Sequence, residues 1–352
     1  MLIFIILLTA ICCIGIRLNK TIDLSTYLSR DRTDSIKGIF ILLVFLSHIN
    51  GYIRKSGYAY DTWGDPVYIF LLGTIGQFMV VMFLFYSGYG VMLSIRNKGL
   101  PYVRKMPLHR ICATLLNFDV AVLLFFIVDL FLGINFPCKQ FLLSLLAWES
   151  IGNSNWYIFV IILCYTITWI SAELMFKRFA GKQNNYFGHF LIAGIFILCS
   201  GLVILLYIFK EPWWYNTILA FPCGALYSEY KLYFEKIIRL HYLHSITFLI
   251  ACFIILFFVH KDPVGLKSNL HAVLFSLLII TITMRVSIEN PILKWCGSNL
   301  FPLYIYQRIP MLFFAAIVPP HILTHYIFFY VLLCLVITIL FAWAYKFWAI
   351  RL

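Results

Sequence analysis

The chain has 352 residues, of which 63% are apolar and only 12% are charged. An average soluble domain carries about 25% charged residues. The apolar residues here fall in long unbroken runs rather than in short alternating segments, which disfavours a membrane β-barrel. A soluble, disordered or collagen-like chain is excluded. We predict an all-α, polytopic integral membrane protein, because a transmembrane helix needs roughly 20 mostly apolar residues.

The apolar runs predict about eleven transmembrane helices. They lie at 2–16, 36–53, 68–95, 111–134, 155–176, 188–209, 213–229, 243–260, 270–288, 299–318 and 324–349. The shorter apolar stretch 138–150 is expected to form an interfacial or re-entrant helix. The first run has neither a basic start nor the small-residue cleavage site of a signal peptide, so we interpret it as an uncleaved span.

The net charge of +13 is interpreted as a topology signal rather than as a nucleic-acid-binding signal. Twenty of the 27 Lys and Arg residues fall on one side of the predicted bundle, and six fall on the other. Because basic residues collect in cytoplasmic loops, this asymmetry predicts a cytoplasmic C-terminus and an outside N-terminus. The ten cysteines show no zinc-binding spacing, so we expect neither a metal site nor an essential disulfide.

Several polar residues fall near the middle of the predicted spans. A helical rise of ~1.5 Å per residue places them ~12–16 Å deep in a membrane core of ~30 Å. They are His48, Ser87, Asp119, Gln307 and Arg308. Each could be satisfied by a neighbour and simply join two helices. Ionisable groups inside a membrane usually face a cavity, however, so we favour one polar cavity shared by these residues.

The stretches DSIKGIFILLVFLSH at 34–48, MFLFYSGY at 82–89 and LKWCGSNLFPLYIYQ at 293–307 resemble, in this order, motifs of the acyltransferase family 3 membrane proteins. Residues 34–48 (DSIKGIFILLVFLSH) are similar to the family's Arg-x10-His motif, with Lys37 at the Arg position and His48 at the His position. Residues 82–89 (MFLFYSGY) are similar to the next motif. A basic segment resembling the family's follows and ends in RKMPLHR at Arg110.

Three further motifs follow in family order. Asn155-Trp156-Tyr157 is similar to the start of the family's fourth span, and 221–224 (FPCG) also resembles a family motif. Residues 293–307 (LKWCGSNLFPLYIYQ) resemble the last motif, with Gln307 in place of the usual His. The KGI-type first motif looks like the fucose 4-O-acetylase branch.

The resemblance implies a ten-helix acyltransferase domain at 34–352, preceded at 1–33 by an extra N-terminal span and a cytoplasmic linker. It implies an O-acyltransferase in a bacterial plasma membrane. Such proteins move an acyl group, usually acetyl from acetyl-CoA, to a hydroxyl of a cell-surface or capsular polysaccharide or of its lipid-linked precursor. Acetyl-CoA would be a co-substrate, and no bound cofactor is expected.

The resemblance, taken with the depths above, assigns roles to twelve residues. His48 is the expected general base, since imidazole can accept a hydroxyl proton near neutral pH. The other expected catalytic residues are Lys37, Asp119 and Arg308. Expected substrate-binding residues are Ser87, Trp156, Gln307 and Tyr304. The phosphates of CoA are expected at the cations Arg96, Arg104, Lys105 and Arg110, although these charges would serve topology equally well.

Some alternatives stay open at this point. Asp119 would either orient His48 or hold Arg308, and Ser87 would either act as a nucleophile or pack helices beside Gly88. A transporter or flippase for a lipid-linked sugar would also need a polar cavity at mid-membrane. A glycan polymerase or ligase is a weaker alternative, because no outer loop here exceeds roughly 20 residues.

Overall fold

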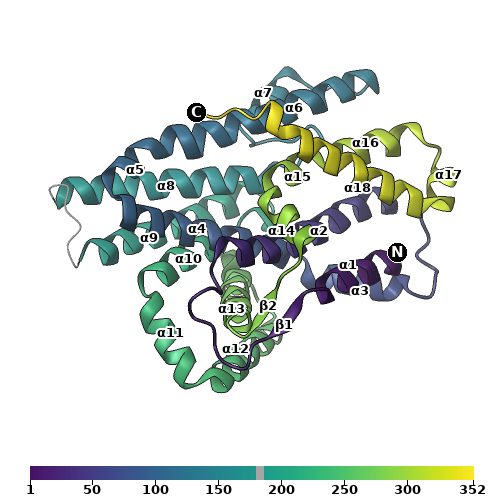
Figure 1. The fold of residues 1–352 in the computed structure, drawn as a ribbon. Coiled ribbons are helices and arrows are strands. Elements are labelled where there is room, and N and C mark those ends of the chain that lie inside the picture. The colour runs from purple at the N-terminus through teal and green to yellow at the C-terminus, as the bar shows by residue number, and fades with distance from the viewer. Residues whose placement is uncertain (180–185) are drawn as a thin grey trace.

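A computed structural model describes residues 1–179 and 186–352, and its long helices run side by side (Figure 1). The longer helices are α2 (Arg30–Lys55), α4 (Phe78–Lys98), α6 (Ala113–Phe131), α8 (Trp156–Arg178), α9 (Phe187–Phe209), α12 (Tyr242–Phe257), α13 (Leu266–Thr283) and α18 (Ile327–Ala344). The shorter ones are α1 (Leu2–Cys13), α3 (Asp65–Ile75), α5 (Leu100–Met106), α7 (Cys138–Leu145), α10 (Ala220–Glu229), α11 (Lys231–Leu240), α14 (Pro291–Ser298), α15 (Leu300–Tyr306), α16 (Arg308–Ile317) and α17 (Pro320–His325). We call the end where α4 meets α5 the basic end, and the end with α3 and α17 the far end (Figure 1).

Within the described residues, eight helical segments are long and apolar enough to cross a membrane, and the bent pair α11–α12 would make a ninth. The predicted count of about eleven is therefore not reached. The run 2–16 yields only the 12 residues of α1, because the chain turns at Gly15 into a short strand. The run 213–229 yields only the ten residues of α10, because Pro212–Trp214 forms a 3-10 turn (η2) ahead of it.

Three of the predicted spans contain breaks or extensions. The run 68–95 divides into α3 and α4 at Gly76, and the run 299–318 divides into α15 and α16 at Gln307. The run 111–134 is longer than expected, because α5 continues into α6 through one π-helical segment, Pro107–Cys112 (η1). π-Helical turns are rare and often mark functional positions.

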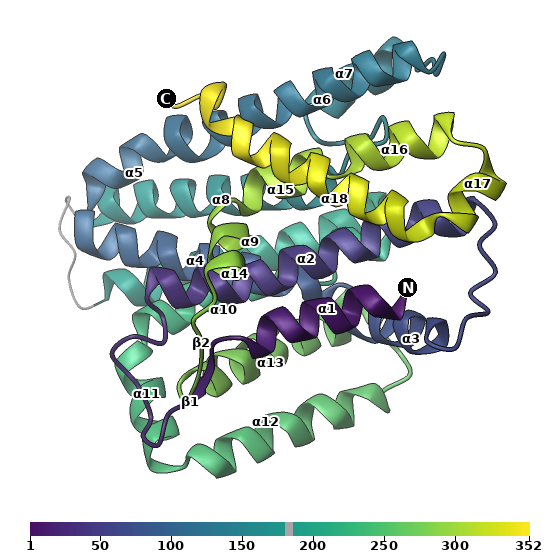
Figure 2. The ribbon, with the colours of Figure 1, turned by 45° about the vertical axis from the view of Figure 1, so that its right-hand side comes forward.

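A two-stranded ribbon departs from the all-α prediction. Strand β1 (Ile16–Leu18) pairs antiparallel with β2 (Val286–Ile288), so the chain just after α1 is fixed to the chain just after α13. Helix α12 lies at the edge of the molecule in both views, beside α13 and joined by α11 (Figures 1 and 2). None of its residues is buried within the described chain.

Glycines allow two pairs of helices to meet at backbone distance. A Cβ atom on Gly38 of α2 would collide with the carbonyl of Leu293 on α14, and one on Gly297 of α14 would collide with the carbonyl of Asp34. The same reciprocal arrangement joins α4 to α10. There, Gly88 faces the carbonyl of Phe221, and Gly224 faces the carbonyl of Phe85. Small residues at such crossings let helices in membranes pack closely.

We expect Gly88→Ala to destabilise the protein by about 1–3 kcal/mol, because the added methyl group must push α10 away from α4. The measurement is the thermal unfolding midpoint of the detergent-purified protein. Gly90→Ala is the matched control: it lies on the same helix, and a Cβ there has no neighbour within 4 Å in the described chain. Because alanine favours a helix over glycine by about 1 kcal/mol, this control should match or exceed the parent. Equal midpoints for both variants would contradict the close crossing.

Candidate functional site

A polar cavity of about 620 Å³ lies toward the far end of the bundle. His48 from the middle of α2 and Arg308 from the start of α16 both line it. Its other walls come from the segment before α8 and the segment that follows α9. They are Trp148, Glu149, Ser150, Asn153, Ser154, Asn155, Trp156, Phe209, Lys210, Glu211, Trp213 and Trp214. We call this space the His48 cavity.

One wall of the His48 cavity is a buried loop at 146–155 rather than a helix. Asn155 fastens this loop, since its Nδ2 donates to the carbonyls of Ala147 (3.0 Å) and Glu149 (2.9 Å). Asn153 Oδ1 accepts from the backbone N–H of Ile151 at 3.0 Å. These hydrogen bonds hold the loop in a shape that lines the cavity with Ser150, Asn153, Ser154 and Asn155.

Four buried polar atoms of residues that line the His48 cavity have no hydrogen-bond partner in the described residues: His48 Nδ1, Arg308 Nε, Asn153 Nδ2 and Ser154 Oγ. Arg308 is held from its other side, where Nη1 donates to the carbonyl of Asn153 at 3.3 Å. The guanidinium also lies over the ring of Tyr52, 5.7 Å from its centroid. Buried polar groups are normally satisfied by protein, water or ligand. These atoms thus define a position for a polar ligand.

Lys210 is held between two indole rings at the mouth of this cavity. Its Nζ lies 3.9 Å from the ring centroid of Trp148 and 4.6 Å from that of Trp214. It also donates to the carbonyl of Trp148 at 2.7 Å and reaches Glu149 Oε1 at 3.4 Å. Cation–π contacts of this kind gain strength when the cation is desolvated, and the Lys210 side chain is only 12% exposed.

A second cavity, of about 400 Å³, lies toward the basic end. Ser87 of α4 and Arg110 of η1 line it, together with Tyr157 and Tyr165 of α8. Its remaining lining residues are Ala113, Thr114, Asn117, Ile158, Ile161, Ser298, Asn299, Leu300, Phe301, Pro302 and Tyr345. We call it the Ser87 cavity. Arg110 is oriented by Tyr165, whose ring centroid lies 5.9 Å from the guanidinium carbon.

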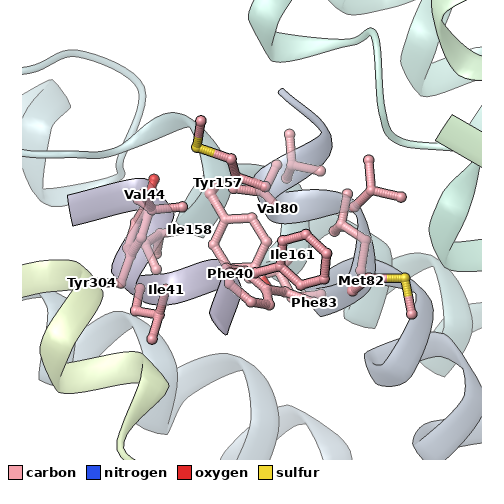
Figure 3. Close-up of a cluster of buried hydrophobic side chains, with 14 of the residues drawn as sticks. Phe40, Ile41, Val44, Val80, Met82, Phe83, Tyr157, Ile158, Ile161 and Tyr304 are labelled. Carbon is pink, nitrogen blue, oxygen red and sulfur yellow. The ribbon is translucent and has the colours of Figure 1, made fainter. Parts of the chain in front are cut away.

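Two tyrosine rings lie between the cavities. The ring of Tyr157 contacts that of Tyr304 with centroids 5.3 Å apart, and Tyr304 lies 6.1 Å from the ring of His48. Figure 3 shows Tyr157 amid apolar side chains of α2, α4 and α8, with Tyr304 at one side next to Ile41 and Val44. Ring contacts through Tyr304 thus connect Tyr157, which lines the Ser87 cavity, to His48, which lines the His48 cavity.

Comparison with known families gives a match over most of the chain. The family model described as an acyltransferase domain, that of the acyltransferase 3 family, matches residues 31–346. The chain belongs to the acyltransferase 3 family. With its apolar helices, it is therefore a membrane acyltransferase. No curated protein and no solved structure matches it significantly. The match agrees with the family resemblance seen in the motifs, while the fucose 4-O-acetylase branch is not distinguished.

Two of the motifs of this acyltransferase now have a packing explanation. The SG pair at Ser87-Gly88 and the FPCG stretch ending at Gly224 meet at the α4–α10 crossing. Gly88 supplies the close contact, and Ser87 beside it faces the Ser87 cavity. The packing interpretation therefore fits Gly88, while the side chain of Ser87 remains available to a ligand.

The single shared cavity expected for the mid-membrane residues is not what the structure shows. His48 and Arg308 line one cavity, and Ser87 lines the other. Gln307 is buried in the break between α15 and α16, with Nε2 donating to the carbonyl of Tyr304 at 3.1 Å. Asp119 lines neither cavity, and its Oδ1 has no hydrogen-bond partner among the residues described. Side chains predicted at the same depth thus face different cavities, because depth does not determine which side of its helix a residue occupies.

Lys37 lies three turns from His48 and forms a local ion pair. Its Nζ is 2.6 Å from Asp34 Oδ1, and the Asp34 side chain is only 4% exposed. Arg30 reaches the other carboxylate oxygen at 3.6 Å. This pair lies at the α2–α14 crossing, where Asp34 also faces Gly297. The contacts recorded for Lys37 are therefore structural, and its expected catalytic role stays a prediction.

The four cations expected to bind CoA fall into two groups. Lys105 and Arg110 line a third cavity, of about 440 Å³, at the basic end. Lys98, Pro101, Tyr102, Met106 and His109 complete it. Arg96 and Arg104 are exposed and are not among its lining residues. Arg110 lines both this cavity and the Ser87 cavity, so the two spaces adjoin.

Sequence reasoning missed the loop residues Asn153 and Ser154 and the cation Lys210. A signal for the loop was present, since the polar run at 149–155 (ESIGNSN) separates two apolar stretches. The predicted boundaries place its first two residues in the interfacial helix at 138–150 and its last residue in the span at 155–176. Asn117, also missed, lies two residues before Asp119 and anchors the chain after α18. Its side chain exchanges two hydrogen bonds with the backbone of Ile350.

We expect Lys37→Ala to reduce stability by about 3 kcal/mol, because it leaves the buried Asp34 carboxylate without its near partner. Lys37→Arg should stay close to the parent, and Asp34→Asn combined with Lys37→Ala should recover most of the loss. The unfolding midpoints in detergent measure all three. If the double variant is no more stable than Lys37→Ala alone, the ion pair does not explain the effect.

Proposed function

We propose that this acyltransferase moves an acyl group, acetyl being the expected one, from acyl-CoA at the basic end to a hydroxyl in the His48 cavity. The acceptor would be a cell-surface or capsular polysaccharide or its lipid-linked precursor. The observation that carries the proposal is that His48 and Arg308, each with a nitrogen that is unpartnered in the described residues, line the same polar cavity among the helices. Only a thin aromatic barrier separates this cavity from a basic-side cavity.

The donor would enter from the basic end. Lys98, Lys105 and Arg110 with Tyr102 form a cationic entrance, and charge-assisted hydrogen bonds to phosphate are among the strongest available to a protein. From Arg110 the path continues into the Ser87 cavity, which is narrow and partly aromatic. An extended pantetheine arm would suit that space and would bring the thioester toward Tyr157.

The acceptor would occupy the His48 cavity. A sugar carries many hydroxyls, and this cavity offers hydrogen-bonding groups on its loop together with Trp156 and Trp213 at its walls. Aromatic rings beside polar groups are typical of pockets that fix a ligand in one orientation. Polar groups held by a rigid loop could position one hydroxyl near His48.

The chemistry would need few groups. His48 would accept the proton of the acceptor hydroxyl as its oxygen attacks the thioester carbonyl. Arg308 would stabilise the negative charge that develops on the carbonyl oxygen. The carbon–sulfur bond then breaks, the ester forms, and CoA leaves as a thiol after taking up a proton. Opening of the Tyr157–Tyr304 barrier would have to accompany transfer, because it separates the two reactants.

The membrane orientation belongs to the same proposal. The basic end would face the cytoplasm, where acyl-CoA is made, and the far end would face outward, in a bacterial plasma membrane. The match to an acyltransferase domain favours this enzyme over the transporter alternative. A transporter for a lipid-linked sugar would need no acyl donor.

We expect His48→Ala and His48→Gln to lower acylation by about 10²–10⁴-fold, because neither side chain can accept the proton. Acylation is measured on purified protein with radiolabelled acetyl-CoA and extracted surface glycan. Acetyl-CoA should still raise the unfolding midpoint of both variants, since binding to the folded state stabilises it. His325→Gln, an exposed histidine on α17, is the control with parental activity. Near-parental turnover of His48→Gln would rule out His48 as the base.

A reporter enzyme that works only in the cytoplasm should be active when it is fused after Leu352, because the asymmetry in basic residues places the basic end there. A second reporter enzyme, one that works only outside the cell, should be active when it is inserted between α2 and α3, near Trp63. The readout is enzymatic activity of the two fusions in cells. The reverse pattern would overturn the orientation, and with it the cytoplasmic donor.

A further inference from the structure

A cavity at 20–25 takes no part in the proposed reaction. It measures about 800 Å³ and lies between the segment ahead of α2, the end of α11 and the start of β2. Figure 2 shows this early segment running beside α11, below the main bundle. Its lining residues are Lys20, Thr21, Ile22, Asp23, Leu24, Ser25, Arg239 and Arg285. None of them lines the His48 cavity, the Ser87 cavity or the third cavity, which contains Lys105 and Arg110.

Three cations face this cavity without an acidic partner. Lys20, Arg239 and Arg285 form no salt bridge with any residue that the structure describes. Arg285 is fixed in place, since Nη2 donates to the carbonyl of Lys20 at 2.7 Å and its guanidinium lies over Tyr242. Its Nε is buried and unpartnered in the described chain. The cavity therefore presents a fixed positive charge to whatever enters it.

The acidic residue of the cavity does not neutralise these cations. Asp23 forms a salt bridge with Arg32 at 2.9 Å. It also accepts hydrogen bonds from the backbone N–H groups of Ser25 (3.0 Å) and Thr26 (2.9 Å). Its oxygens are thus engaged within its own turn and with α2. The positive charge of the other three side chains is left for an anion.

The exposed face of helix α11 is that of a helix at a membrane interface. The helix is bent by 104° from α12, and it exposes Leu232, Tyr233 and Leu240 together with the cation Lys236. Its buried face includes Glu235, which pairs with Lys231 at 3.4 Å. A helix with one apolar exposed face at the end of a membrane span lies along the interface. Arg239, near the end of α11, therefore sits where phosphates of the bilayer are found.

We propose that this cavity binds the phosphate of an anionic phospholipid from the leaflet at the basic end. Arg239 and Arg285 would hold the phosphate oxygens through paired N–H donors, and Lys20 would add a third charge. The exposed apolar residues of α11 and α12 would contact the acyl chains. Basic pockets between membrane helices attract anionic lipid headgroups electrostatically. The site would fix α11 and the β1–β2 ribbon, and it is independent of the acyl-transfer proposal.

The test compares lipid binding by the parent and by Lys20→Gln/Arg239→Gln. Binding of phosphatidylglycerol and of phosphatidylcholine to the detergent-purified protein is measured by native mass spectrometry and by the shift in unfolding midpoint. Arg285 is left unchanged, because it also holds the backbone of Lys20. The control is Lys177→Gln/Lys236→Gln, which removes two exposed cations at the basic end outside the cavity.

The parent should bind phosphatidylglycerol at least tenfold more tightly than phosphatidylcholine. The cavity variant should lose about 30-fold of that affinity, which corresponds to ~2 kcal/mol for its two cations, and the control should keep it. Inorganic phosphate, added as a third arm, should compete only weakly. Equal binding of the two lipids, or equal loss in both variants, would overturn the proposal. Protection by inorganic phosphate alone, lost in the cavity variant, would overturn the lipid assignment in favour of a soluble phosphate.

Discussion

The close approach of helix backbones at glycine is the constraint on which the rest of the structure depends. Helices in a membrane gain little from burying apolar surface, because lipid is equally apolar, so close packing must supply much of their association. Gly38 with Gly297, and Gly88 with Gly224, let α2 meet α14 and α4 meet α10 without intervening side chains. The first crossing fixes the helix that carries His48, and the second fixes the helix that carries Ser87.

The two crossings also explain why the short helices matter. Neither α10 nor α14 is long enough to cross a membrane, with ten and eight residues respectively. The pairs α10–α4 and α14–α2 nevertheless make the most extensive helix–helix contacts in the described chain. At the α2–α14 crossing the contact is reinforced by an ion pair, in which Lys294 Nζ lies 2.6 Å from Asp31 Oδ2 on α2. Short helices therefore hold the two long helices whose polar residues line the cavities.

Hydropathy and charge predicted the class of the protein but not its geometry. Apolar runs located the long helices well, because length and composition decide whether a segment can span a membrane. They could not reveal that the runs around α1 and α10 break early, since Gly15 and Pro212 act through backbone conformation within otherwise apolar stretches. Helical depth placed His48, Ser87 and Arg308 near one level, as the rise per residue requires. It could not tell which cavity each side chain faces, because that depends on the rotation of every helix.

The irregular segments carry the polar chemistry, and the cost of polarity in a membrane explains why. A continuous helix satisfies its own backbone groups, so its wall is apolar unless a side chain intervenes. One wall of the His48 cavity is instead the non-helical loop at 146–155, and Arg308 of α16 faces that loop. The loop carbonyl of Asn153 accepts from Arg308 Nη1, so the loop and α16 each satisfy part of the other's polar groups. What they leave unsatisfied, including Arg308 Nε and Asn153 Nδ2, surrounds the same space as His48. Four buried polar atoms without a partner in the described residues thus border one space, which is the arrangement expected of a site that binds a polar ligand.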